Sequence, residues 1–265
     1  MELKSHRIED LIQFGIDVIR RSGERALNYY GKRKHHVKFD EGLVTEAELH
    51  LLEFFQDQLH DTFPEHQMFK NIQNMDGYTH EEKRYLWIYD PLDGVANFQT
   101  GIPIWGTSLA LLDNSWPIFG IFYMPSTKDL FQAQAGQKAL WGKEAINTST
   151  QENINDESLL LTYSRFHQNY QCTFPGKIRD LGCTAAHICY TAMGCAEAAL
   201  IANESYQDLA AACVIIEAAG GKIYKMDGSK FFINEYLDGQ RIDDHLLVVA
   251  PHLYSQVRKC LKEIT

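Results

Sequence analysis

The chain has 265 residues, of which 45% are apolar and 23% are charged, a composition typical of a globular protein with a sizeable core. Its formal net charge of −10 and pI of about 5.5 disfavour a nucleic acid or an anionic membrane as a partner. The basic cluster at 32–36 is short and typical of a solvated loop. No apolar run reaches the length of a membrane span, and Met1 is followed by Glu2 and Lys4 instead of a signal peptide. We therefore expect a cytoplasmic protein.

All six cysteines lie in the second half of the chain, and no two of them form a C-x-x-C pair. Most of them have apolar neighbours at helical spacing. Reduced, buried thiols are therefore expected in preference to a disulfide or a zinc site. The six are Cys172, Cys183, Cys189, Cys195, Cys213 and Cys260.

The first half of the chain begins with helical patterns and continues with strand patterns. Apolar residues at helical spacing predict a helix over 7–30, and Thr45 precedes a second helical pattern over 46–60. Strand patterns bounded by turn residues follow Asp90, at about 105–113, 117–124 and 128–134.

The second half alternates strands and helices, which is typical of layered α and β structure. The polar stretch 145–157 is the best boundary between the two halves. We expect one domain, with an α+β half at about 1–150 and an α/β half at about 155–265. The predicted strands are 158–163, 196–202, 222–225 and 245–250, and the predicted helices are 183–194, 208–219 and a terminal helix.

A five-residue segment, DPLDG at 90–94, follows an apolar strand pattern. Pro91 is expected to end that strand and to confine Asp90 to extended backbone. The final glycine allows a tight turn, so Asp93 can face the same side as Asp90. Two carboxylates and the Leu92 carbonyl would then suit Mg²⁺. The segment alone leaves open a simple turn, with Asp93 as a helix N-cap.

A second acid, Asp208, begins an apolar helical pattern whose first turns contain Ala210, Ala211 and Ala212. Small side chains let the start of a helix approach another backbone closely. By itself, an acid at this position is a good N-cap.

Together these segments resemble the inositol monophosphatase family of Mg²⁺-dependent, lithium-sensitive phosphatases. The family signature D-P-[IL]-D-G-x-x-N-F is matched at 90–98, and W-D-x-A-A followed by E-A-G-G is matched at 207–211 and 218–221. The family segments L-V-T-E-A-D and F-P-x-H are matched at 43–48 and 63–66. The resemblance implies an α+β fold, a layered αβαβα sandwich of the inositol monophosphatase and sugar phosphatase type, and commonly a homodimer.

The resemblance also implies a set of functional residues for metal-assisted phosphoryl transfer with Mg²⁺ or Mn²⁺. One metal would activate water, and another would stabilise the leaving oxygen and the phosphate charge. The implied metal ligands are Asp90, the Leu92 carbonyl, Asp93, Asp208 and Asn71. The resemblance implies that three of them, Asp90, Asp93 and Asp208, converge on one cation. Glu48, Asp90 and Asp93 are the implied catalytic residues. The implied substrate-binding positions are Gly94, Val95, Cys183, Thr184 and Ile201.

Several of these positions depart from the family pattern. Asn71, beside Lys70, replaces a glutamate of the activated-water metal site. Val95 replaces a threonine that orients the water, and Glu48 replaces its partner aspartate. Ile201 replaces a substrate-contacting glutamate. The changes at 71, 95 and 201 together indicate altered or abandoned chemistry.

Two functions remain open from the sequence. The first is Mg²⁺-dependent hydrolysis of a small phosphomonoester, with weak activity and an altered substrate. The second is a non-catalytic binding or regulatory module that keeps a metal-phosphate pocket. The predicted partner is a small phosphorylated substrate, and neither a nucleic acid nor a membrane is expected.

Overall fold

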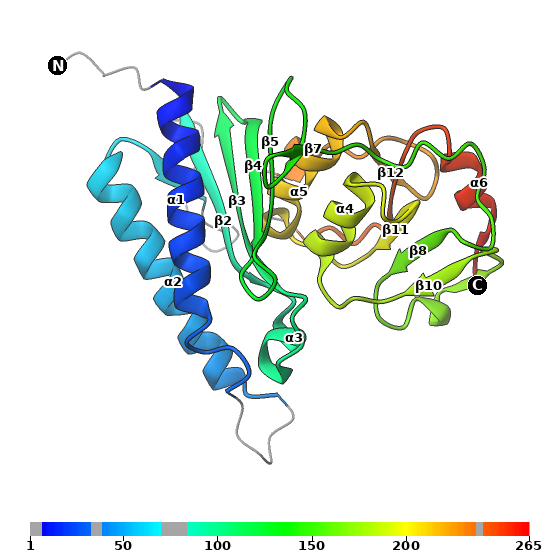
Figure 1. Ribbon diagram of the computed structural model, residues 1–265, viewed down its shortest axis with the longest axis horizontal. Coiled ribbons are helices and arrows are strands. Elements are labelled where there is room, and N and C mark those ends of the chain that lie inside the picture. The colour runs from blue at the N-terminus through cyan, green and yellow to red at the C-terminus, as the bar shows by residue number, and fades with distance from the viewer. Residues whose placement is uncertain (1–6, 33–38, 70–83, 237–240, 265) are drawn as a thin grey trace.

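The computed structural model describes residues 7–32, 39–69, 84–236 and 241–264. In this part of the chain, layers of helices alternate with β-sheets, five layers in all (Figure 1). A pair of long helices covers one face of a seven-stranded sheet. Two further helices separate this sheet from a five-stranded sheet, and a short helix lies on the far side. This αβαβα arrangement confirms the predicted α+β class.

The outer layer consists of α1 (Ile8–Ala26) and α2 (Glu41–Thr62). Helix α2 begins five residues before the predicted 46–60 pattern. The reason is Asp40, whose side chain accepts a hydrogen bond from the Leu43 amide and caps the helix upstream of Thr45. The apolar faces of both helices pack on the buried aromatic residues Trp87 and Tyr89 of the sheet.

The seven-stranded sheet follows the chain order, so each strand is hydrogen-bonded to its neighbours in sequence. The first pair is parallel and the others are antiparallel. Three of its strands match the predicted strands closely. The strands are β1 (Gln67–Met68), β2 (Tyr85–Asp93), β3 (Gly106–Asp113), β4 (Trp116–Met124), β5 (Asp129–Gln134), β6 (Leu140–Trp141) and β7 (Glu144–Ala145).

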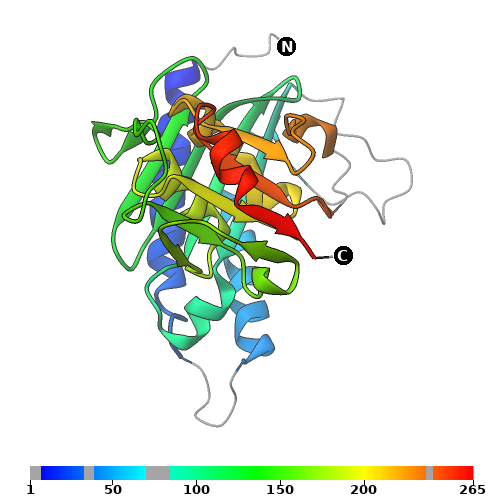
Figure 2. The same cartoon turned by 90° about the vertical axis from the view of Figure 1, so that its right-hand side faces the viewer.

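The five-stranded sheet contains all four strands predicted in the second half. Its order is β10 (Lys177–Arg179), β8 (Leu159–Thr162), β11 (Ala198–Ile201), β13 (Leu246–Val249) and β12 (Lys222–Lys225). The terminal helix is only α6 (Tyr254–Lys259), and the chain then forms β14 (Leu261–Glu263), which pairs with β9 (Tyr170–Cys172). Figure 2 shows α6 and β14 in front of this sheet.

The middle layer consists of α4 (Thr184–Ala192) and α5 (Tyr206–Ala218). Helix α5 lies directly on β4, where a Cβ atom added to Gly120 would stand 2.4 Å from the Ala211 carbonyl oxygen. The small residues predicted to permit a close backbone approach therefore do so. The start of α5 lies near the end of β2, where the Gln207 side-chain amide donates a hydrogen bond of 3.3 Å to the Tyr89 carbonyl oxygen.

The core consists of three clusters, one on each side of the first sheet and one between the second sheet and α6. All six cysteines are free, but the expectation that they are buried holds for only three of them, Cys183, Cys189 and Cys213, because Cys195 is exposed and the other two are partly buried. Among the described residues, no helix is both long and apolar enough to cross a membrane.

The contact at Gly120 gives a stability prediction. Gly120→Ala should lower the free energy of unfolding by about 1–3 kcal/mol, because the new methyl group meets backbone that cannot move cheaply. Gly42→Ala is the matched control. Among the described residues, its Cβ would meet only the Asp40 side chain, at 3.4 Å, so this variant should be neutral or slightly stabilising. Urea unfolding compares them, and equal effects would contradict the close approach.

Candidate active site

Strand β2 continues past Asp90 to Asp93, so the expectation that Pro91 ends it is wrong. Asp90 pairs with Ser108 and Asp93 pairs with Gly106. Three residue steps on β2 therefore oppose two on β3, and the ladder is irregular between these pairs. A bulge of this kind accommodates a proline, because one residue is left without a ladder partner. The bulge re-aims the side chains on either side of it.

The Asp90 carboxyl group is buried at this bulge, with 8% of the residue exposed. Its Oδ1 accepts a hydrogen bond of 3.1 Å from the Leu92 amide. Its Oδ2 is buried without a hydrogen-bond partner among the described residues. Burial raises the pKa of Asp90 well above its usual value, and the negative charges of Asp208, Asp93 and Glu48 raise it further.

Asp93 points toward the first turn of α4. Its carboxylate accepts hydrogen bonds from the Ala185 amide at 2.6 Å, the Thr184 amide at 3.3 Å and the Cys183 thiol at 3.2 Å. A carboxylate is favourable at a helix N-terminus, because it satisfies free amides and the helix dipole. Burial, opposed by the Ala185 amide, raises the pKa of Asp93 to about 6.

Asp208 lies in the first turn of α5 but is not its N-cap. Ser205 is the N-cap, and the two residues form a capping box. The Ser205 amide donates to Asp208 Oδ2 at 2.7 Å, and the Asp208 amide donates to Ser205 Oγ at 3.3 Å. Burial raises the pKa of Asp208, and the positive charge of Arg241 lowers it.

The remaining predicted residues on the N-terminal side surround the bulge. Glu48 of α2 is half-buried, and its desolvation raises its pKa. Gly94 has a φ of 80° and is the N-cap of the short helix α3 (Val95–Thr100). A Cβ there would stand 2.9 Å from the Ile104 carbonyl oxygen, so glycine is required at this position.

Not every predicted site residue joins this group. Asn71 lies outside the described residues. Ile201 is fully buried in the core between the two sheets, so its side chain is not available to a substrate. Cys183 and Thr184 do lie at the site, but they contact Asp93.

One buried acid near the site, Glu204, was not predicted from the sequence. It lies in the turn between β11 and α5, and its Oε1 accepts a hydrogen bond of 2.9 Å from Thr184 Oγ1. Burial and the charges of Asp208 and Asp93 raise its pKa to about 8. Its position four residues before Asp208, directly after an apolar strand, is the signal that could have identified it.

A second residue links the halves of the site. The Asn97 amide group donates hydrogen bonds of 2.6 Å to the Ile104 and Leu181 carbonyl oxygens. Leu181 precedes α4, so this side chain ties α3 to the segment that carries the Asp93 partners. Asn97 is 8% exposed. We assign it a structural role in assembling the site.

The donor set suits a hard cation such as Mg²⁺, because the oxygens are carboxylates that raise one another's pKa and Asp90 Oδ2 has no partner in the part of the chain that the structure describes. The described residues do not form a finished cage, however. Within them, no group of three or more His, Cys, Asp or Glu side chains could hold a metal ion. Convergence of Asp90, Asp93 and Asp208 on one cation therefore stays a prediction.

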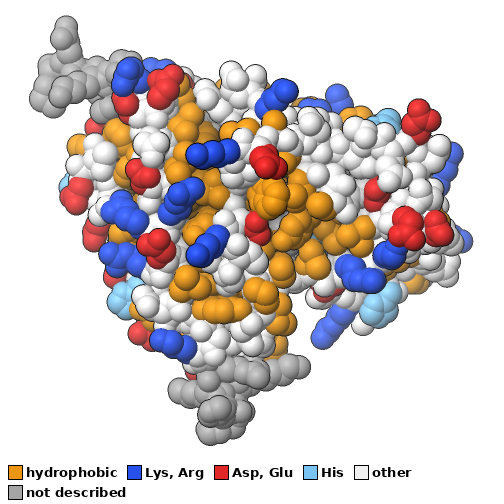
Figure 3. Space-filling view, viewed as in Figure 1, with side chains coloured by type: hydrophobic (Ala, Val, Ile, Leu, Met, Phe, Trp, Pro, Cys, Tyr) orange, Lys and Arg blue, Asp and Glu red, His pale blue; other side chains and the backbone are white. Residues whose placement is uncertain are grey.

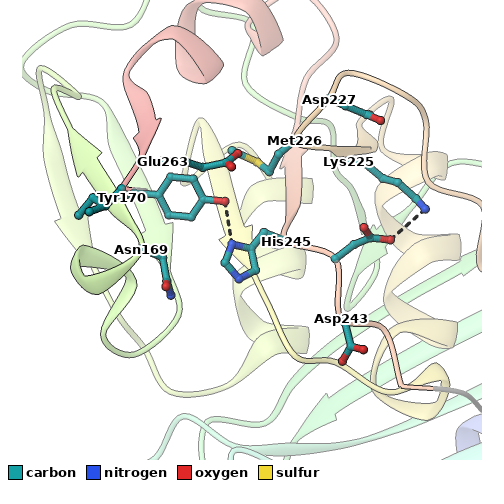
Figure 4. Close-up of a pocket in the computed structure, with 10 residues that line it drawn as sticks. Asn169, Tyr170, Lys225, Met226, Asp227, Asp243, His245 and Glu263 are labelled. Atoms are coloured by element: carbon teal, nitrogen blue, oxygen red, sulfur yellow. Dashed lines mark hydrogen bonds and ion pairs between the residues drawn. The ribbon is translucent and has the colours of Figure 1, made fainter.

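A separate cavity of about 390 Å³ lies in the C-terminal half (Figure 4). The Tyr170 hydroxyl and His245 Nδ1 are 2.7 Å apart in it, and Lys225 forms an ion pair of 2.9 Å with Asp244. Its lining includes none of the predicted site residues. The cavity is therefore separate from the site at β2.

Comparison with known proteins agrees with the fold and with the order of the motifs. The fold resembles the solved structure of a Thermotoga maritima IMPase, with a TM-score of 0.76 and 23% identity over 95% of this chain and 96% of that one. The sequence is 25% identical to a T. maritima fructose-1,6-bisphosphatase/inositol-1-monophosphatase, over 94% of this chain and 98% of that protein. It is 29% identical to the Nus factor SuhB of Xylella fastidiosa, over 61% and 59%.

The layered fold and the acid-rich bulge define a chain of the phosphatase-like αβαβα class. The sequence model of the inositol monophosphatase family matches residues 7–258. The chain belongs to the inositol monophosphatase family, which confirms the resemblance seen in its motifs.

The raised pKa of Glu204 predicts how stability depends on pH in the absence of divalent cations. An acid with a higher pKa in the folded chain than in the unfolded chain binds more protons when folded. Its contribution is therefore most favourable below the unfolded pKa and is lost as the pH rises through the folded value of about 8. Between pH 6.5 and 8.5, the free energy of unfolding should fall by about 1–2 kcal/mol.

Urea unfolding in chelator, at pH values across this range, measures the effect. Glu204→Gln should flatten the profile, because the amide does not ionise. An identical pH profile in the wild type and in Glu204→Gln would contradict the assignment.

Proposed function

We propose that the protein is a Mg²⁺-dependent phosphomonoesterase of low activity that acts on a small phosphorylated substrate. The observation that carries this proposal is the buried Oδ2 of Asp90, which has no hydrogen-bond partner among the described residues and belongs to a carboxyl group whose pKa is raised by burial and by three other acids. Such an arrangement is unfavourable without a counter-charge, and a divalent cation provides one. Family membership supports phosphate ester chemistry.

The residues that would hold the cation are Asp90, Asp93, Asp208 and the Leu92 carbonyl, with a weaker contribution from Asn71. When bound, Mg²⁺ or Mn²⁺ would supply a Lewis acid and lower the pKa of water. Because its pKa is raised, Glu48 is the candidate base. The backbone amides of Gly94 and Val95 are candidate donors to the phosphate.

Low activity is part of the proposal because two groups that handle the attacking water are absent. Val95, 36% exposed, has no hydroxyl group to orient a water molecule. Asn71 offers a neutral oxygen where a carboxylate would bind the cation more tightly. Because Ile201 is buried, its side chain cannot contact a substrate, so the proposal includes an altered substrate preference.

The alternative is a non-catalytic family member that binds a ligand or regulates a partner. One observation favours it: a relative at 29% identity is named a Nus factor. The net charge of −10 argues that such a partner would be a protein and not a nucleic acid. A panel of phosphomonoesters with Mg²⁺ and Mn²⁺ distinguishes the two functions, because only the enzyme releases phosphate.

We further propose a homodimer in the cytoplasm. Hydrophobic side chains gather on the face seen in Figure 3, over the region between the first sheet and α4. Val95 and Ile102, both partly exposed, belong to the apolar surface of the chain near α3. Sedimentation equilibrium tests the dimer. Reduced thiols at all six cysteines are consistent with this location.

The weakened water activation predicts a gain of function. Asn71→Glu combined with Val95→Thr should raise Mg²⁺-dependent kcat/KM on one phosphomonoester by at least about tenfold. Each single change should achieve much less, since both act on the same water. The measurement compares wild type, singles and double at saturating Mg²⁺. Lys70→Glu is the natural third change, because it removes a positive charge beside position 71.

Two outcomes would contradict this explanation. An ordinary enzyme rate in the wild type, unaffected by the double change, would mean that other groups activate the water. A folded double variant that remains inactive would favour the non-catalytic function. Asp90→Asn in the double variant is the control, since it should abolish any activity that was gained.

A further inference from the structure

Glu204 is a buried acid with no part in the proposed chemistry. It is 8% exposed, although it lies in a connection between a strand and a helix. Its backbone is fixed, because the Ile242 amide donates to the Glu204 carbonyl oxygen at 2.9 Å. A carboxyl group is costly to bury unless it forms specific hydrogen bonds. A specific role would explain why this side chain is buried.

The observed hydrogen bond connects Glu204 to the start of α4. Thr184 is the first residue of that helix, and its Oγ1 lies 2.9 Å from Glu204 Oε1. The backbone amide of the same threonine donates to Asp93 Oδ1, and the next amide, that of Ala185, donates to Asp93 Oδ2. One continuous series of hydrogen bonds thus runs from Glu204 through the first turn of α4 to Asp93.

The cap of α4 makes this connection necessary. Its N-cap residue, Cys183, makes no side-chain capping hydrogen bond to the helix. The Cys183 thiol donates to Asp93 instead. The first turn is therefore held from two sides, by Asp93 on its amides and by Glu204 on the Thr184 hydroxyl group.

We propose that Glu204 is a positioning residue, which fixes the first turn of α4 through Thr184 and thereby holds Asp93 in place for cation binding. The proposal rests on the proposed function for its cation and on the described contacts for its geometry. Supporting groups of this kind typically change metal affinity by about 10–100-fold when removed.

Two substitutions of Glu204 distinguish a positioning residue from a direct ligand of the cation. In the cation-free protein, burial and the charges of Asp208 and Asp93 raise the pKa of Glu204 to about 8, which favours its neutral form at pH 7. Glutamine has the same shape, keeps an oxygen that accepts from Thr184, and is also neutral. Alanine removes the acceptor. A positioning residue therefore tolerates Glu204→Gln and not Glu204→Ala, whereas a charged ligand tolerates neither.

Isothermal titration of the full chain with Mn²⁺ at pH 7 measures the effect. Glu204→Ala should raise the Kd for Mn²⁺ by at least about tenfold, and Glu204→Gln by less than about threefold. Thr184→Val should reproduce Glu204→Ala. The double variant should be no worse than either single change, because both remove one interaction. Equal losses for Gln and Ala would overturn positioning in favour of ligation.

Glu197 provides the matched control for folding. It is also a buried glutamate in the second half, and its carboxylate accepts from the Leu159 amide at 2.6 Å and from Ser149 Oγ at 3.4 Å. Its contacts hold β8 and do not reach α4. Glu197→Ala should lower thermal stability and leave the Kd for Mn²⁺ unchanged. A change like that of Glu204→Ala would mean that general destabilisation is the cause.

A second measurement needs no cation. Hydrogen exchange of the cation-free protein reports the Thr184 and Ala185 amides, which should exchange faster in Glu204→Ala but not in Glu197→Ala. Unchanged exchange in Glu204→Ala overturns the positioning role, whatever the titration gives. Failure of the wild type to bind Mn²⁺, with faster exchange in Glu204→Ala, would instead sink the proposed function and leave the positioning role standing.

Discussion

Burial of several like charges at the end of β2 is the constraint on which the site depends. Asp90 is almost fully buried at a bulge, and its neighbours are Asp93, Asp208 and Glu48. Each acid makes ionisation of the others less favourable, and the low local polarity strengthens that effect. A fold selected only for stability would replace such groups with apolar ones. Chemistry or binding explains the presence of these acids, and packing does not.

The layered architecture brings these acids together from distant parts of the chain. Because Gly120 has no side chain, α5 packs closely on β4, and this packing places Asp208 near the bulge. Asn97 fastens the turn after the bulge to the segment before α4. The first turn of α4 then holds Asp93. Small residues and a few buried polar bonds thus determine where the carboxyl groups lie, while the three apolar clusters supply most of the stability.

The sequence predicted the fold class and most elements, because apolar periodicity and the ordered motifs agree with one another. It failed where a local contact overrides a residue's usual tendency. Pro91 normally ends a strand, yet the bulge lets β2 continue to Asp93. Asp208 looked like an N-cap, but Ser205 caps α5. Glu204 has no motif around it, and only the burial created by the fold gives it significance. The role of position 71 stays a prediction.

We propose that the carboxyl groups around Asp90 form a site for a divalent cation. Thermal unfolding at pH 8.5, with chelator or with 100 Kd of Mg²⁺, tests it most directly, because ionised carboxylates gain most from a cation. Binding of this strength stabilises the folded chain by about 2.7 kcal/mol, so the wild-type Tm should rise by about 5–10 °C. Asp90→Asn should show no such rise and should be at least as stable as the wild type in chelator. A wild-type Tm that does not change with millimolar Mg²⁺ or Mn²⁺ would contradict the proposal, and so would an equal rise in the Tm of Asp90→Asn.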